Sequence, residues 1–190
     1  HPVFHGSVVK AIASGLRTYP KIISALGDKT AATGTDEEYK IFRAHMQDLL
    51  VPRVQSVTRH SASVVELTVR APLAARKFRP GQFFRLQNFE TPAPLIDGAR
   101  LQTETLALTG AKVDADAGTV SLIVLELGAS SRLVATLRPG EPVALMGPTG
   151  VRTHIGEGDE TVMVVGGRRG AAHIRAVGPA LRAKGKRVLY

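Results

Sequence analysis

The chain has 190 residues, of which 44% are hydrophobic and 22% charged, a composition typical of folded globular proteins. It contains no Cys, which excludes disulfides, thiolate metal sites, an iron–sulfur cluster ligated by this chain and a Cys nucleophile. No apolar run has the length that crosses a membrane, and no secretory leader is visible. We therefore expect a cytoplasmic protein with no membrane partner.

The net charge is +9, and it is concentrated near the end of the chain. Residues 161–190 contain seven basic residues and no acidic residue. Nucleic-acid binding usually combines such basic residues with aromatic ones or a recognisable reading motif, but aromatic residues make up only 5% of the chain. We therefore expect no nucleic-acid partner, and favour an anionic small ligand or an acidic partner surface.

Residues 1–50 form the first predicted part, a helical N-terminal extension or linker. Apolar residues from Ser7 to Leu26 follow helical spacing, but Gly15 and Pro20 interrupt it, which predicts two short helices rather than one. Asp36 is predicted as the N-cap of a further helix that ends near residue 50. Because the chain opens with His1 instead of Met, we expect it to be a piece of a larger protein.

Residues 51–150 form the second predicted part, a mainly β domain. Short β-branched and alternating runs are separated by turn residues, and one small helix is expected over residues 130–137. The sequence therefore predicts a six-stranded antiparallel Greek-key barrel. Its strands are expected at residues 54–58, 64–70, 82–89, 105–109, 119–125 and 142–146.

Residues 160–190 form the third predicted part. The apolar run 162–165 is typical of a buried parallel strand, and a Gly-rich turn, a helix to about Lys184 and the strand Val188–Tyr190 follow it. This order predicts the first βαβ unit of a nucleotide-binding domain, truncated after its second strand.

Two turns carry candidate binding residues. Gly166, Gly167 and Gly170 precede the last helix, where a phosphate could approach the backbone, but their spacing does not match the dinucleotide fingerprint. Ser130 and Ser131 could hold a pyrophosphate or simply cap a helix. The sequence offers no catalytic triad, carboxylate pair or metal cluster, so we expect neither an acid–base catalytic residue nor a metal.

Five motifs, in this order, resemble those of the ferredoxin–NADP reductase superfamily: Arg79-Pro80-Gly81-Gln82-Phe83, Gly128-Ala129-Ser130-Ser131, Pro139-Gly140, Met146-Gly147-Pro148-Thr149-Gly150 and Val165-Gly166-Gly167. The likeness is greatest to the electron-transfer subunit of dihydroorotate dehydrogenase. Similar modules are fused to subunits resembling the glutamate synthase small chain. The resemblance covers about residues 51–190. It implies an FAD barrel, an NAD(P)H domain and a partner redox centre in another subunit or a fused domain.

The resemblance also assigns candidate residues. It implies that Gly128, Ser130 and Ser131 contact the flavin diphosphate, that Gly166, Gly167 and Gly170 contact the nicotinamide nucleotide, and that Thr105, Leu106 and Ala107 line the isoalloxazine by position.

One departure concerns the Arg-x-Tyr/Phe-Ser/Thr motif, whose Arg meets the flavin pyrophosphate in the family. The matching positions here read Glu104-Thr105-Leu106-Ala107, so an acid replaces the cation that would bind phosphate. A second departure is Arg168-Arg169 in the Gly-rich turn, where the two bulky cations could either favour or block the binding of a phosphate.

Two functions remain open at this point. The first is an FAD- and NAD(P)H-dependent electron-transfer module of a larger oxidoreductase, inactive alone because its nicotinamide domain is truncated. The second is a flavin-free structural or docking module that keeps the barrel, motivated by Glu104. Either could be oligomeric.

Overall fold

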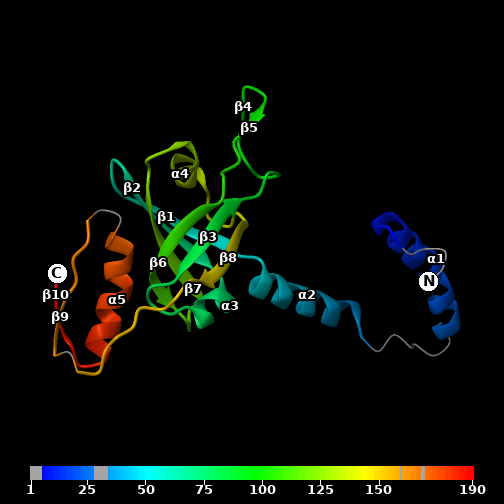
Figure 1. Cartoon of the computed structure of the whole chain (residues 1–190). Helices are drawn as coiled ribbons and strands as arrows, with labels where there is room; N and C mark the ends of the chain where they lie inside the picture. Colours follow the sequence, from blue (N-terminus) through cyan, green and yellow to red (C-terminus); the bar gives the residue numbers. More distant parts are fainter. Residues whose placement is uncertain (1–5, 28–33, 159, 168–169) are drawn as a thin grey trace. The chain divides into compact units, whose positions relative to one another are not determined.

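A computed structural model describes residues 6–27, 34–158, 160–167 and 170–190 (Figure 1). Arg168 and Arg169 therefore lie outside the described residues. The chain divides into two compact units, residues 1–43 and 44–190. No described helix is both long enough and apolar enough to span a bilayer.

The helices are α1 (Val8–Leu26), α2 (Asp36–Leu50), α3 (Pro72–Lys77), α4 (Ala129–Leu133), the 3-10 turn η1 (Val134–Thr136) and α5 (Ala171–Ala183). The strands are β1 (Arg53–Ser61), β2 (Val64–Arg70), β3 (Phe83–Asn88), β4 (Leu95–Ile96), β5 (Ala99–Arg100), β6 (Leu106–Asp114), β7 (Thr119–Leu125), β8 (Val143–Thr149), β9 (Thr161–Met163) and β10 (Arg187–Leu189).

Two predictions about the N-terminal helices were wrong: the number of helices over residues 8–26 and the residue that caps the next helix. Residues 8–26 form one helix with Pro20 inside it, so the prediction of two short helices was wrong. Ser7 caps α1 by accepting a hydrogen bond from the Lys10 N–H at 3.1 Å. Helix α2 is capped by Thr35, not Asp36, because the Thr35 hydroxyl accepts from the Glu38 N–H while the Glu38 carboxylate accepts from the Thr35 N–H.

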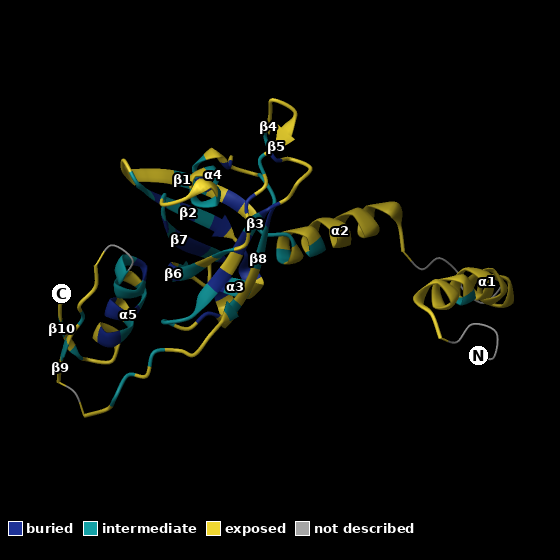
Figure 2. Ribbon diagram, turned by 45° about the horizontal axis from the view of Figure 1, so that its top comes forward, coloured by how far each residue is buried: buried dark blue, intermediate teal, exposed yellow. Residues whose placement is uncertain are grey.

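The second unit is built on one antiparallel sheet of six strands in the order β1-β2-β7-β6-β3-β8, which confirms the six predicted strands. Strands β2 and β7 form its centre, where Val65 pairs with Val124 and Leu67 with Leu122. All four side chains are almost fully buried. Because alternate residues of a strand point to opposite faces, these positions form one wall of the core (Figure 2).

The outer strands of the sheet meet at one place. An isolated antiparallel bridge joins Arg53 of β1 to Pro142, just before β8, and the Val54 N–H donates to the Glu141 carbonyl at 2.9 Å. Within the described ranges no continuous ladder joins β1 to β8. The structure thus shows a six-stranded antiparallel sheet, with a single bridge between its edges.

Helix α3 and the small β4–β5 hairpin were not predicted. Helix α3 starts with Pro72 in its first turn, a position where the missing N–H costs no helical hydrogen bond. Gly118, at φ +66°, packs against this proline, since a Cβ on Gly118 would lie 3.1 Å from the Pro72 ring. The Ala71 N–H also donates to the Gly118 carbonyl at 2.8 Å.

The last part of the chain has the predicted strand–helix–strand order, but the prediction of a buried strand over residues 162–165 was wrong, because the strand is β9 (Thr161–Met163) and none of its three residues is buried. Strands β9 and β10 are parallel, with Val162 paired to Val188, and α5 runs between them in the chain. Helix α5 lies beside the sheet and packs against β6 and β7 (Figure 1), with Ala176 against the hydrophobic core. The other side of this segment is open, since Met163 and Val165 are largely exposed.

The difference in burial predicts a difference in local stability. Amides of β9 and β10, which form a two-stranded ladder of three residues each, should exchange hydrogen at least about a hundredfold faster than those of β2 and β7. The reason is that β2 and β7 each have a hydrogen-bonded neighbour on both sides. Hydrogen exchange followed by NMR measures both sets. Equal protection would show that the βαβ segment opens only with the sheet.

Candidate functional site

A cavity of about 380 Å³ lies over strands β6 and β7. We call it the β6–β7 cavity. Of the predicted site residues it contains Leu106, Ala107 and Ser131. Ala172, two residues after Gly170, lines it from the first turn of α5. Its walls are Leu106, Ala107, Leu108, Thr109, Ile123, Val124, Leu125, Leu127, Ser131 and Ala172.

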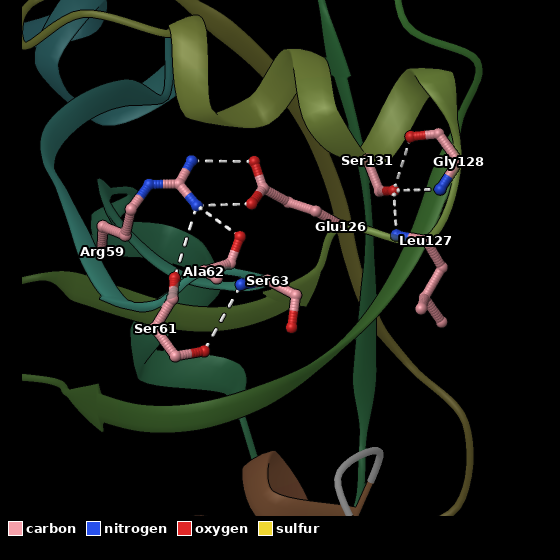
Figure 3. A network of polar contacts seen from close by, with 8 residues as sticks. All are labelled: Arg59, Ser61, Ala62, Ser63, Glu126, Leu127, Gly128 and Ser131. Carbon is pink, nitrogen blue, oxygen red and sulfur yellow. Dashed lines mark hydrogen bonds and ion pairs between the residues drawn. The ribbon is translucent and has the colours of Figure 1, made fainter.

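The turn from Leu127 to Ser131 is held by the hydroxyl of Ser131 (Figure 3). The Ser131 Oγ accepts from the N–H groups of Leu127 and Gly128, both at 3.0 Å, and donates to the Gly128 carbonyl at 2.9 Å. Its hydrogen-bonding capacity is therefore used by the chain itself. Ser131 builds the start of α4, which matches the capping alternative considered for this residue.

Ser130 connects this turn to the segment where the family motif departs. The Glu104 N–H donates to the Ser130 Oγ at 3.1 Å, so the structure brings Glu104 beside the start of α4. Thr105 is exposed, and its hydroxyl donates to the Gln87 Oε1 at 3.2 Å. Thr105 is not among the residues that line the β6–β7 cavity.

The glycines in the turns before α4 and α5 differ in how much space surrounds their backbone. A Cβ on Gly128, Gly167 or Gly170 would have no atom within 4 Å, whereas a Cβ on Gly166 would lie 2.8 Å from the Ile174 side chain. A side chain at Gly166 would therefore have to displace the end of the Ile174 side chain, and it would also lie 3.2 Å from the Gly170 Cα. The other three leave open space in front of the backbone, which a ligand could occupy.

An ion pair that the sequence analysis missed ties the α4 turn to the sheet (Figure 3). The Arg59 guanidinium donates to both carboxylate oxygens of Glu126, with Nη2 at 2.9 Å from Oε1. It also reaches the Ala62 carbonyl at 3.2 Å. The hydrogen bond from Arg59 lowers the pKa of Glu126. Because Glu126 precedes Leu127 directly, this bidentate pair orients the turn.

The comparisons with known proteins give both a fold and a lineage. No family model matches the chain. An uncharacterised protein of Rickettsia prowazekii, RP006, is 36% identical over 164 residues, which cover 86% of this chain and 22% of that protein. The electron-transfer subunit of dihydroorotate dehydrogenase B (NAD(+)) of Bacillus cereus (strain Q1) is 25% identical over 146 residues, covering 76% of this chain and 52% of that subunit.

Among solved structures, an NADH-dependent reduced ferredoxin-NADP oxidoreductase matches with a TM-score of 0.63 and 20% identity over 73% of this chain and 46% of that one. A ferredoxin NADP+ reductase from Neisseria gonorrhoeae with bound FAD and NADP matches with a TM-score of 0.54 and 19% identity, covering 73% and 54%. The chain contains a ferredoxin reductase-like module. It spans about half the length of the Bacillus subunit, to which it is distantly homologous.

In the described residues of this ferredoxin reductase-like module no group of His, Asp and Glu side chains has the arrangement of a metal site. A different polar cluster, centred on Glu66 of β2, joins the sheet to α5. The Arg175 Nη1 donates to the Glu66 Oε2 at 2.9 Å, and the His60 Nε2 lies 2.7 Å from the same oxygen. The Ser121 hydroxyl donates to the other carboxylate oxygen.

The electrostatics of Glu66 follow from these contacts. Burial of its carboxyl raises its pKa, but the hydrogen bonds from Ser121, His60 and Arg175 outweigh burial and lower the pKa to about 2. The carboxylate is thus ionised at neutral pH and acts as the anchor for the Arg175 side chain of α5. The contact spans 109 positions of the sequence, which is why no local pattern predicted it.

The Glu66 cluster predicts a pH dependence. A lowered folded-state pKa stabilises the protein above the unfolded value of about 4.5, and this stabilisation is lost as the pH falls toward 2. Glu66→Gln should therefore lower the free energy of unfolding at pH 7 by about 1 kcal/mol, a small value because Arg175 and His60 are nearly half exposed. It should also flatten the pH dependence between 4.5 and 2.

Urea unfolding between pH 2 and pH 7 measures both effects of this substitution, with Glu90→Gln, an exposed acid outside the cluster, as the matched control. If Glu66→Gln and the control show the same pH dependence as the unsubstituted protein, the carboxylate does not anchor α5.

Proposed function

We propose that this module binds FAD in the β6–β7 cavity and passes electrons from NAD(P)H through the flavin to a partner redox centre. One observation carries the proposal. The cavity is lined by Leu106, Ala107 and Ser131, which come from the two separate segments that the resemblance assigned to a flavin. Its apolar walls and open side suit a flat ring system, which needs burial on its faces and few polar contacts.

The turn before α4 offers the flavin diphosphate a place to bind. Gly128 has open space where a side chain would stand, so phosphate oxygens can approach the backbone N–H groups of residues 129 and 130. The Ser130 hydroxyl, which accepts from Glu104, still has its own proton to donate. Ser131 holds the turn in shape. Helix α4 has only five residues, so individual N–H groups rather than a helix dipole would make these contacts.

The nicotinamide nucleotide is assigned to the turn before α5. Gly167 and Gly170 leave open space, and α5 is 13 residues long, so its unpaired N–H groups and dipole favour a phosphate. Ala172 connects this turn to the β6–β7 cavity. The two cofactors would therefore approach each other at the β6–β7 cavity, as hydride transfer requires.

In this proposal the chemistry belongs to the flavin, which takes up a hydride and releases single electrons. The side chains of this chain bind and orient it: Leu106 and Ala107 exclude water from one face, and Arg59 and Glu126 fix the α4 turn. No side chain has to transfer a proton. The Arg53–Pro142 bridge supports the further proposal that the sheet closes as a Greek-key barrel behind the site, with domains at residues 51–150 and 160–190.

The relatives support a redox partner. The Bacillus protein is named an electron-transfer subunit of a dehydrogenase, so a protein of this lineage works beside a second redox subunit. We extend that arrangement to this chain, with the partner in another subunit or in a fused domain. The alternative is a flavin-free docking module. It is favoured by one observation, the acid Glu104 beside the α4 turn, where a cation would attract phosphate.

Gly128 gives the most selective test of FAD binding. Gly128→Val should leave the fold intact, since a Cβ there meets no atom within 4 Å, but its side chain would fill the place assigned to the diphosphate. We expect FAD affinity, measured by quenching of flavin fluorescence, to fall at least about tenfold. The matched control is Gly158→Val, at another open glycine away from the cavity, which should bind FAD normally. Equal FAD affinities in the two variants would show that the diphosphate does not bind at the α4 turn.

Glu104 supplies the second test. Glu104→Arg places a cation beside Ser130, and a charged hydrogen bond to phosphate is worth about 1.5–3 kcal/mol, or roughly ten- to a hundredfold tighter FAD binding. Asp116→Arg makes the same charge change at an exposed turn and should have little effect. The docking-module alternative predicts no FAD binding in either variant. Tighter binding in both variants would indicate a general charge effect instead of a contact at residue 104.

A further inference from the structure

A second, larger cavity lies on the other half of β6. Its volume is about 840 Å³, within the range of small-molecule sites. It is bounded by the end of α3 and the loop after it, by residues 111–115 and by one side of α5. We call it the α5 cavity. It shares no lining residue with the β6–β7 cavity, so it is separate from the proposed flavin site.

The walls of the α5 cavity are mainly apolar. Phe78 directly follows α3, Val113 is in β6, Ile174 and Pro179 are in α5, and Tyr190 directly follows β10. The Tyr190 ring is held by the Arg182 guanidinium, 5.2 Å from its centre. These surfaces converge from four places in the fold, so a flat apolar body would be covered on several sides at once.

Every charged residue among the described residues that line this cavity is basic: Arg76, Arg79, Lys112 and Arg175. Arg175 is neutralised by Glu66, and Arg79 donates to the carbonyls of Arg76 and Phe78. Arg76 and Lys112 form no ion pair with a carboxylate in the described part of the chain. Two exposed cations therefore lie at the edge of an apolar cavity, and no acid of the described residues is paired with them.

We propose that the α5 cavity binds an organic anion that joins a planar apolar body to a single phosphate, carboxylate or sulfonate group. The apolar walls bury the body, which gains affinity from removal of apolar surface from water. Arg76 and Lys112 pair with the anionic group, and a charge-assisted contact gives the site its preference over neutral ligands. Because the walls come from both the sheet and α5, the bound anion would also hold α5 against the sheet.

The test uses the full chain and 1-naphthyl phosphate as the probe, followed by NMR at the methyl and amide groups. We expect saturable shifts at Val113 and Ile174, with little change at Leu106 and Ile123 of the other cavity. Neutral 1-naphthalenemethanol and inorganic phosphate should each bind at least about tenfold more weakly. The first compound lacks the anionic group, and the second lacks the apolar ring. AMP and 1-naphthoate then distinguish a nucleotide from an aromatic carboxylate as the preferred anion.

Matched charge reversals distinguish the effect of charges at the cavity on probe binding from the effect of the protein's net charge. The double variant Arg76→Glu with Lys112→Glu should bind 1-naphthyl phosphate at least about tenfold more weakly. Lys77→Glu with Arg85→Glu makes the same change in net charge at exposed positions outside the cavity and should not. The proposal is overturned by equal weakening in both double variants, by equal binding of the neutral analogue, by shifts at Leu106 instead of Val113, or by the absence of binding at millimolar probe. Shifts at Val113 that depend on protein concentration without the probe would place a second copy in the cavity and also overturn it.

Discussion

The packing of α5 on the outer face of the sheet is the interaction on which both cavities depend. Ala172 of α5 closes one side of the β6–β7 cavity, and Ile174 and Pro179 form a wall of the α5 cavity. The Glu66–Arg175 ion pair and the packing of Ala176 against the hydrophobic core hold the helix in place. A strand face covered in this way is drier than an open one, which strengthens each polar contact made there.

The sheet itself supplies rigid positions for the candidate site. Leu106 of β6 is paired with Leu86 of β3, and Ile123 of β7 is paired with Glu66 of β2, so each of these two cavity residues is held by a neighbouring strand. The α4 turn, in contrast, is a loop stabilised by particular polar contacts: Ser131 with the backbone, and Arg59 with Glu126. This combination of a fixed apolar wall and a hydrogen-bonded turn is common where a flat cofactor with a charged tail is bound.

Much of this fold could be predicted from the sequence because its signals are local. The alternation in residues 64–70 and the turn glycines identified the strands, and the strand–Gly-rich turn–helix order identified the βαβ segment. Pro20 was given too much weight, since an exposed helix lost only one hydrogen bond there and continued to Leu26. Helix α3 was too short to show a period, and Pro72 was its only clear signal.

The sites were harder to predict because they depend on contacts between distant residues. Sequence analysis named Leu106, Ala107 and Ser131, which do meet in one cavity, but it could not tell that the Ser131 hydroxyl is used by the turn. Thr105, by contrast, lies outside that cavity. Neither the Arg59–Glu126 pair nor the α5 cavity has a sequence signature, since the pair joins residues 67 positions apart and the cavity is formed by three segments that are distant in the sequence.

The most direct measurement of the central claim is the visible spectrum of the purified chain after incubation with FAD and removal of the free cofactor. The account predicts a yellow protein with an absorption band near about 450 nm, shifted from that of free FAD, and release of roughly one FAD per chain on denaturation. A colourless protein that releases no flavin after incubation with excess FAD would contradict it and would leave the docking module as the better description.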